Sequence, residues 1–137
     1  MNRSRLIAIT LSATFLLAVA LPAAASSRHP FRGNWKATDT FDQSNLTYRI
    51  VEVARSGGRV FDIDGHDDRT GPWCGGGPAS MNAVGVLEGD NSMAVSLVWI
   101  CLAPSHNVLY FLSDTLTYDP STNTITDLAG DVFHRDP

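Results

Sequence analysis

The densest group of residues that could do chemistry is acidic and lies near the middle of the chain. One short stretch holds four aspartates: Asp62, Asp64, Asp67 and Asp68. Gly65 and His66 lie between the second and the third. Carboxylates two positions apart in an extended segment point to the same side, so the first two could act together. The loop that follows could bring one of the other two to a hard cation such as calcium. The stretch lacks the ligand spacing and terminal Glu of an EF-hand, so a solvated acidic strand end is the competing interpretation.

The other candidate catalytic groups are isolated from one another. No zinc-binding spacing connects the histidines, which stand at positions 29, 66, 106 and 134. Ser105 and His106 adjoin, but neighbours in an extended chain point apart, and no nucleophile elbow surrounds them. The glutamates, Glu52 and Glu88, have no recognisable setting for glycoside hydrolysis. We therefore expect no enzyme activity and no cofactor, and a secreted hydrolase is the least favoured alternative.

The first residues carry a targeting pattern. Arg3 and Arg5 are followed by an apolar run from Leu6 to Leu21 and by the small residues Ala23-Ala24-Ala25. This order predicts a secretory signal peptide over residues 1–25 and one secreted domain over residues 26–137. No later stretch approaches the ~20 apolar residues of a membrane span, so none is expected.

The charge of the chain argues against nucleic acid as a partner. The formal net charge is −4, and loss of two arginines with the signal peptide leaves the rest more acidic still. The remaining arginines are scattered and Lys36 is the only lysine, so no basic stripe could follow phosphates. Both cysteines, Cys74 and Cys101, belong to the exported part. We expect them to form a disulfide, because an oxidising compartment lets such a pair persist.

Short alternating segments separated by turn residues predict an all-β protein. Gly, Asp, Asn and Pro occupy the breaks, and the connections are short except for Gly65 to Ala79. Each strand should then pair with its sequence neighbour, which gives a small up-and-down antiparallel β-barrel of about eight strands. The expected strands are Gly33 to Asp39, Asn45 to Ala54, Arg59 to Asp64, Ser80 to Glu88, Ser92 to Leu102, Val108 to Tyr118, Thr124 to Leu128 and Val132 to Arg135. In the sixth strand the alternation leaves open which face points inward.

The two ends of the domain carry a resemblance to a known group of barrels. Gly33-Asn34-Trp35 opens the first strand and Phe133-His134-Arg135 closes the last. This arrangement resembles the calycins, which include the lipocalin, fatty-acid-binding and avidin families. The resemblance implies that Trp35 plugs one end of the barrel and that Arg135 lies over its ring, which adds a cation–π contact. The chain also resembles a group of uncharacterised bacterial secreted domains, and that likeness implies no activity.

Two functions of different classes remain in competition. The first is a secreted, non-catalytic barrel that binds a small apolar ligand or an extracellular protein, and the second is a structural or surface-associated domain whose acidic loop binds calcium. We expect a monomer in either case. Long connections in compact domains are often functional. The expected binding site is therefore the long connection, with Asp64, His66, Asp67, Asp68 and Trp73.

Overall fold

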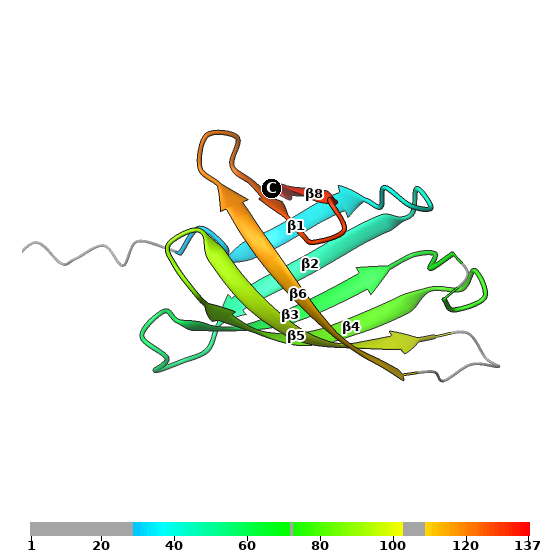
Figure 1. Ribbon diagram of the computed structural model, residues 1–137, viewed down its shortest axis with the longest axis horizontal. Helices are drawn as coiled ribbons and strands as arrows, with labels where there is room; N and C mark the ends of the chain where they lie inside the picture. Colours follow the sequence, from blue (N-terminus) through cyan, green and yellow to red (C-terminus); the bar gives the residue numbers. More distant parts are fainter. Residues whose placement is uncertain (1–28, 72, 103–108) are drawn as a thin grey trace, which may run out of the picture.

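The protein is an all-β closed barrel of eight antiparallel strands in up-and-down order, and this confirms the predicted fold class (Figure 1). The computed structural model describes residues 29–71, 73–102 and 109–137. The expected signal peptide, the Ser105-His106 pair and Val108 lie outside the described residues. Within the described ranges, no helix has the length and apolar character needed to cross a membrane.

The strands follow the predicted alternation closely. They are β1 (Gly33–Thr38), β2 (Asn45–Glu52), β3 (Val60–Asp67), β4 (Ala79–Leu87), β5 (Ser92–Cys101), β6 (Leu109–Asp119), β7 (Thr124–Thr126) and β8 (Val132–Arg135). The main difference concerns β3, which was expected to end at Asp64 and continues to Asp67. The long connection is correspondingly shorter and spans residues 68–78.

β3 continues because Gly65 allows the strand to pass a crowded part of the barrel interior. Gly65 pairs with Tyr48 on β2 and with Met81 on β4. A Cβ atom built on Gly65 would lie 2.6 Å from the Met81 Cε and 3.0 Å from the Tyr48 Cδ1. A glycine in a strand commonly marks such a close approach. The prediction that a loop begins at Gly65 is therefore wrong.

The first and last strands pair, as predicted, and the Trp35 ring is covered by Arg135. The Arg135 Cζ lies 4.2 Å from the ring centroid, while its two terminal nitrogens donate to the carbonyl oxygens of Arg32 and Pro30 at 2.7 and 2.6 Å. Trp35 Nε1 donates to the Phe31 carbonyl at 2.7 Å. Gly33 makes this possible, because a Cβ there would lie 2.5 Å from Arg135 Nη1.

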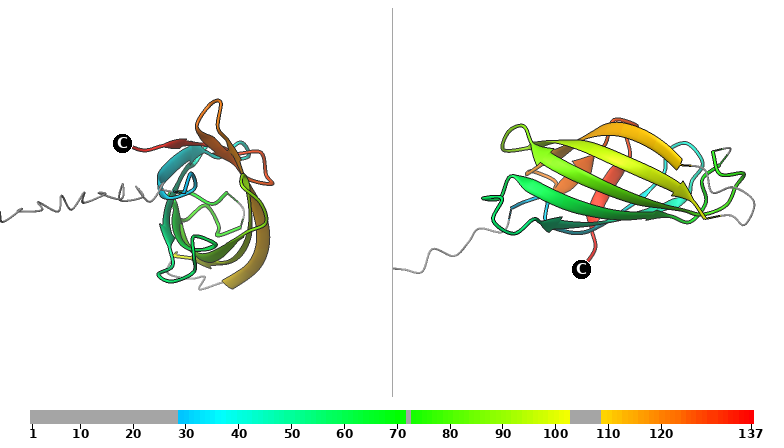
Figure 2. Two further views of the ribbon diagram at one scale, coloured as in Figure 1. Left: turned by 90° about the vertical axis from the view of Figure 1, so that its left-hand side faces the viewer. Right: turned by 90° about the horizontal axis from the view of Figure 1, so that it is seen from below.

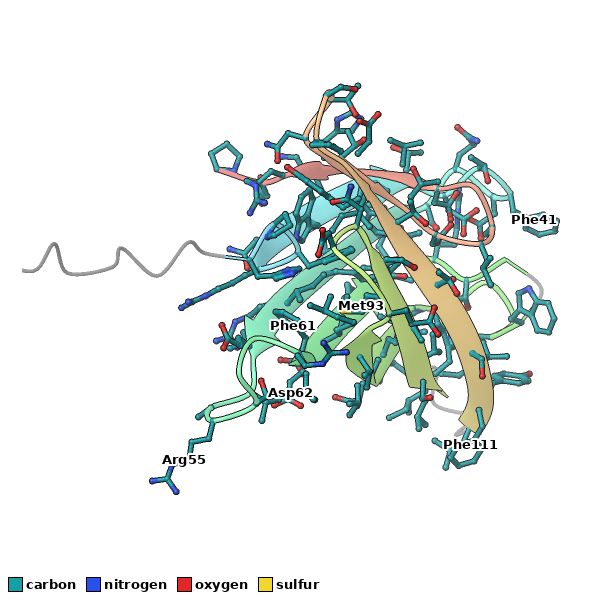
Figure 3. The ribbon with its side chains drawn as sticks, turned by 60° about the vertical axis from the view of Figure 1, so that its left-hand side comes forward. Phe41, Arg55, Phe61, Asp62, Met93 and Phe111 are labelled. Atoms are coloured by element: carbon teal, nitrogen blue, oxygen red, sulfur yellow. A yellow bond between two sulfur atoms is a disulfide. The ribbon has the colours of Figure 1, made fainter. Side chains whose placement is uncertain are left out.

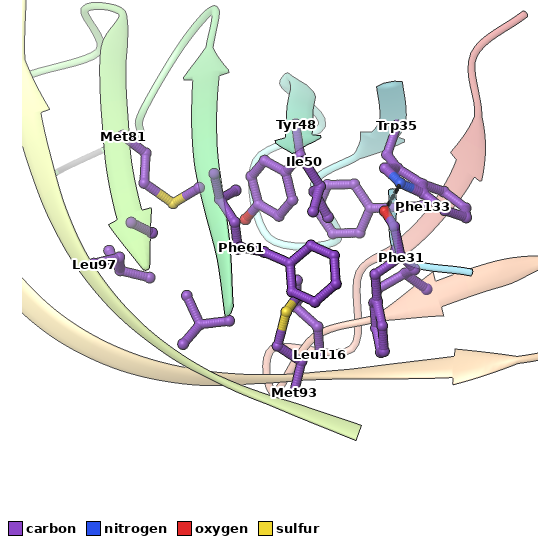
Figure 4. Close-up of a cluster of buried hydrophobic side chains, with 14 of the residues drawn as sticks. Phe31, Trp35, Tyr48, Ile50, Phe61, Met81, Met93, Leu97, Leu116 and Phe133 are labelled. Carbon is purple, nitrogen blue, oxygen red and sulfur yellow. Dashed lines mark hydrogen bonds between the residues drawn. The ribbon is translucent and has the colours of Figure 1, made fainter. Parts of the chain in front are cut away.

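The core fills the barrel next to this plug (Figure 4). Alternate residues of β5 point inward and are buried, namely Met93, Val95 and Leu97. The register of β5 with β6 places Leu112, Asp114 and Leu116 on the same inner face, which answers the question left open by the alternation. The largest buried side chains of the core are Phe31, Trp35, Ile50, Phe61, Ile63, Met93, Leu116, Ile125 and Phe133.

The two ends of the barrel differ in their connections. The plugged end carries Phe31, the Trp35–Arg135 stack and the β2–β3, β4–β5 and β6–β7 turns. We call the other the loop-bearing end. It carries the described connections 39–44, 68–78 and 127–131. Figure 2 shows the ring of strands from one end and from the side, and Figure 3 places Phe41 and Phe111 toward one end and Arg55 at the other.

Candidate functional site

The structure divides the predicted acidic stretch among three environments. Asp62 and Asp64 share the outer wall of β3, where both are exposed, as their spacing predicted. Asp67 points into the barrel and is 3% exposed, whereas Asp68 is exposed at the end of the strand. Within the described ranges, no three acidic, histidine or cysteine side chains are close enough to hold a metal ion. The four aspartates are therefore not brought together as calcium ligands.

Asp64 and His66 line a hollow of about 320 Å³ on the outer wall of β1, β2 and β3. Its other polar side chains include Asn34, Thr47 and Arg49, and Arg49 Nη1 lies 3.8 Å from Asp64 Oδ2. Both members of this ion pair are mostly exposed, so it contributes little stability. A second hollow, of about 300 Å³, lies over β5 and β6. Neither hollow is the apolar interior cavity that a small-ligand carrier would show.

Trp73 lies at the loop-bearing end, where the disulfide holds its loop. Cys74 and Cys101 are bonded, as predicted, and both are buried. The Trp73 side chain is 65% exposed, and its ring meets the Tyr110 ring edge-on with centroids 5.8 Å apart. The Tyr110 hydroxyl donates to the Trp73 carbonyl at 3.2 Å. Trp73 is thus an exposed aromatic side chain on an anchored backbone.

A second group of carboxylates, which the sequence analysis missed, lies inside the mouth of the loop-bearing end. We call these residues the interior carboxylates: Asp67, Asp114, Asp127 and Asp131. Asp114 is on the inner face of β6, and Asp127 and Asp131 begin and end the β7–β8 connection. Asp127 Oδ1 accepts from the Asp131 amide at 2.9 Å, and Asp114 Oδ1 accepts from the Leu128 amide at 3.0 Å.

Burial raises the pKa values of two of the interior carboxylates, Asp127 and Asp67. Desolvation, followed by the charges of Asp131 and Asp114, raises the pKa of Asp127 to about 6. Burial also raises the pKa of Asp67. The pKa of Tyr48 is raised well above its usual value by burial and then by the charges of all four interior carboxylates. The Tyr48 phenol therefore lies within the electrostatic reach of the group.

Exposed apolar side chains surround the same mouth. Among the described residues, every exposed large hydrophobic side chain except Val84 and Val86 lies at or near the loop-bearing end: Phe41, Trp73, Leu102, Leu109, Phe111, Leu112, Leu128 and Val132. Phe41 is 74% exposed and Phe111 is 78% exposed. We call this set the apolar rim. Such a concentration on one part of a surface is typical of an interaction site.

The described loops of this end are predominantly acidic. The described connections hold Asp39, Asp42, Asp68, Asp127 and Asp131, and their basic side chain is Arg69. Arg69 Nη2 donates to the Asp42 carbonyl at 2.6 Å. The apolar rim and the interior carboxylates together form a surface that would suit a partner carrying both apolar and cationic side chains.

One signal in the sequence could have pointed to this site. Asp114 alternates with Leu112 and Leu116, so a carboxylate interrupts an otherwise apolar strand face. A charged residue on an inward face needs a partner or a polar opening. Nothing in the sequence indicated that Asp127 and Leu128 belong to this site, because only the folded β7–β8 connection brings them beside β6.

Comparisons with known proteins support the fold and no more. No protein-family model matches the chain, and no curated protein matches it. A redesigned β-barrel is similar in structure, with a TM-score of 0.52 and 18% sequence identity over 80% of this chain and 96% of the designed one. At that identity the likeness concerns the barrel architecture alone, and it indicates no ligand or partner.

Proposed function

We propose that this protein is a secreted, non-catalytic binding module that docks a basic, partly apolar segment of an extracellular protein at its loop-bearing end. The observation that carries the proposal is the concentration of the apolar rim around an acidic mouth. Aromatic anchors beside charged groups are common where proteins recognise one another. The disulfide and the N-terminal targeting pattern support export, and the Trp35–Arg135 stack supports a calycin-like barrel.

A protein partner suits this barrel better than a small apolar ligand. The core beside the plug is packed with aromatic and aliphatic side chains, and the two hollows described above lie on the outer wall. The interior carboxylates lie at the end where a ligand would enter the barrel, and an apolar molecule among them would leave their charges uncompensated. Basic side chains of a partner would instead neutralise them.

A peptide selection tests the proposal. The folded domain would be presented with a library of ten-residue peptides that place Lys or Arg at alternate positions and random apolar residues between them. A matched library would carry Asp or Glu at the charged positions. We expect binders from the basic library only, with an affinity that falls as the salt concentration rises.

Two sets of variants locate the site. Phe41→Ser, Trp73→Ser and Leu128→Ser together remove exposed apolar side chains of the rim, and this variant should weaken binding at least tenfold. Val84→Ser with Val86→Ser removes exposed apolar side chains from the outer wall of β4 and serves as the matched control. Equal binding of both libraries, or equal losses in both variants, would contradict the proposal.

A further inference from the structure

β6 has a long edge that pairs with none of the described strands. The strand pairs with β5 from Leu109 to Thr117 but with β7 only from Thr117 to Asp119. Among the strand residues described, no Cα of β6 comes within 8 Å of a Cα of β1 or β8. The barrel is therefore closed through the short strands β7 and β8, while β6 diverges from β1 toward the loop-bearing end (Figure 1).

The ladder identifies which backbone groups are free at this edge. The Tyr118 amide donates to the Asn91 carbonyl, on the β5 side of β6. Since backbone groups of an antiparallel strand alternate between its two sides, those of Leu109, Phe111 and Ser113 point away from β5. The Thr115 amide, on the same side, is capped by Asp114 Oδ1 at 2.6 Å. Three successive pairs of amide and carbonyl groups thus face the space between β6 and β1.

This edge lacks the features that usually prevent strand addition. Residues 109–113 contain no charge and no proline, and the outward-facing Leu109 and Phe111 are exposed. Natural edges are normally protected by lysine, proline, a bulge or a covering loop. Leu112 points inward by its register with Leu97, yet it is 49% exposed, because none of the described strands lies beyond it.

We infer that the partner segment binds as an added β-strand along residues 109–113 of β6. This inference rests on the proposed function, since it specifies how the same basic, apolar segment docks. Backbone hydrogen bonds to Leu109, Phe111 and Ser113 supply the pairing, as in β-augmentation. Side chains opposite Leu112 enter the mouth and approach the interior carboxylates, so basic residues belong there. Side chains opposite Phe111 lie on the outer face, where apolar residues extend the contact.

Amide hydrogen exchange, measured by NMR with a peptide from the basic library, tests the added strand. We expect the amides of Leu109, Phe111 and Ser113 to exchange at least tenfold more slowly in the complex. Those of Leu112 and Leu116, already paired with β5, should change much less. Ser113→Pro removes one edge donor without touching the β5 ladder and should weaken binding at least fivefold, while Ser113→Ala should bind normally.

The outcomes separate this inference from the function on which it rests. If the basic peptide binds and rim substitutions weaken it while the three edge amides stay unprotected, strand addition is wrong and the proposed function stands. If no basic peptide binds, both are wrong. If the edge amides become protected with rising protein concentration and no peptide, the edge pairs with a second copy of this chain, and a foreign segment is not its occupant.

Discussion

The plugged end and the loop-bearing end of this barrel use similar residue types in opposite ways. At the plugged end, Trp35 is buried under Arg135, and the indole nitrogen and both terminal guanidinium nitrogens donate to carbonyl oxygens. At the loop-bearing end, Trp73 is exposed, and the interior carboxylates are buried or half-buried near one another. The difference indicates that the plugged end provides stability, while the loop-bearing end carries groups whose arrangement costs stability, and it is there that we propose binding.

The largest expected effect that tests this contrast is the replacement of one tryptophan at each end. Trp35→Ala should lower the free energy of unfolding by about 3 to 5 kcal/mol, because it leaves a cavity in the core. Trp73→Ala should change it by less than about 0.5 kcal/mol, because the side chain is mostly solvated. Denaturant titration measures both.

Trp35→Phe is the second variant at the plugged end, in case Trp35→Ala does not fold. It keeps most of the ring volume but loses the hydrogen bond to the Phe31 carbonyl. Similar losses for Trp35→Ala and Trp73→Ala would remove the distinction between the two ends.

Removal of the disulfide should have the next largest effect. Cys74 and Cys101 are 27 positions apart, a loop whose closure is worth about 3.5 kcal/mol on chain-entropy grounds. Reduction should loosen residues 68–78 and leave the barrel folded, since the strand pairs do not depend on the bond. Circular dichroism should retain its β-sheet signal, and hydrogen exchange should accelerate in the loop. Complete loss of the β-sheet signal would show that the loop-bearing end also supports the fold.

A smaller effect is expected for Arg135→Ala at the plugged end. The guanidinium stacks on Trp35 and donates to two carbonyl oxygens that close this end of the barrel. Its loss should lower stability by about 1 to 2 kcal/mol. Arg69→Ala is the matched control at the other end, where the side chain makes a single exposed hydrogen bond to a carbonyl. Thermal unfolding of both variants shows whether the two ends differ.

The sequence was sufficient for the features that depend on local pattern. Alternation located all eight strands, and the resemblance of the Gly33-Asn34-Trp35 start to the calycins implied the contact with Arg135, which the structure shows. The site was harder to predict. Gly65 resembled a loop residue, although it lies within β3 at a point where the Met81 side chain leaves no room for a Cβ atom. The short strands β7 and β8 were predicted, but the free edge of β6 was not, because it also depends on how far β6 diverges from β1, which the sequence pattern does not specify.

The smallest expected effect is the pH dependence of the stability that two aspartates contribute. It isolates the electrostatics of the loop-bearing end. The pKa of Asp127 is about 6 in the folded protein, mainly through burial, against 3.8 ordinarily. Between these pH values the folded state binds more protons than the unfolded chain, so this group makes the protein less stable as the pH rises. Asp127→Asn keeps an oxygen to accept from the Asp131 amide and removes the buried charge.

The Asp127→Asn variant should therefore gain stability over the wild type at pH 7.5, by about 1 kcal/mol after solvent screening, and little at pH 4. Asp68 provides the opposite sign at the same end. The side-chain and backbone hydrogen bonds from Asn45 lower the pKa of Asp68, so its charge stabilises the fold at neutral pH and this contribution is lost as the pH falls through the lowered pKa. Asp68→Asn should then lower the thermal midpoint at pH 7.5 and have less effect in acid. If Asp127→Asn lowered the midpoint at pH 7.5, as Asp68→Asn is expected to do, the charge of Asp127 would not be held at a cost, and the proposed role of the interior carboxylates in attracting a basic partner would lose its physical basis.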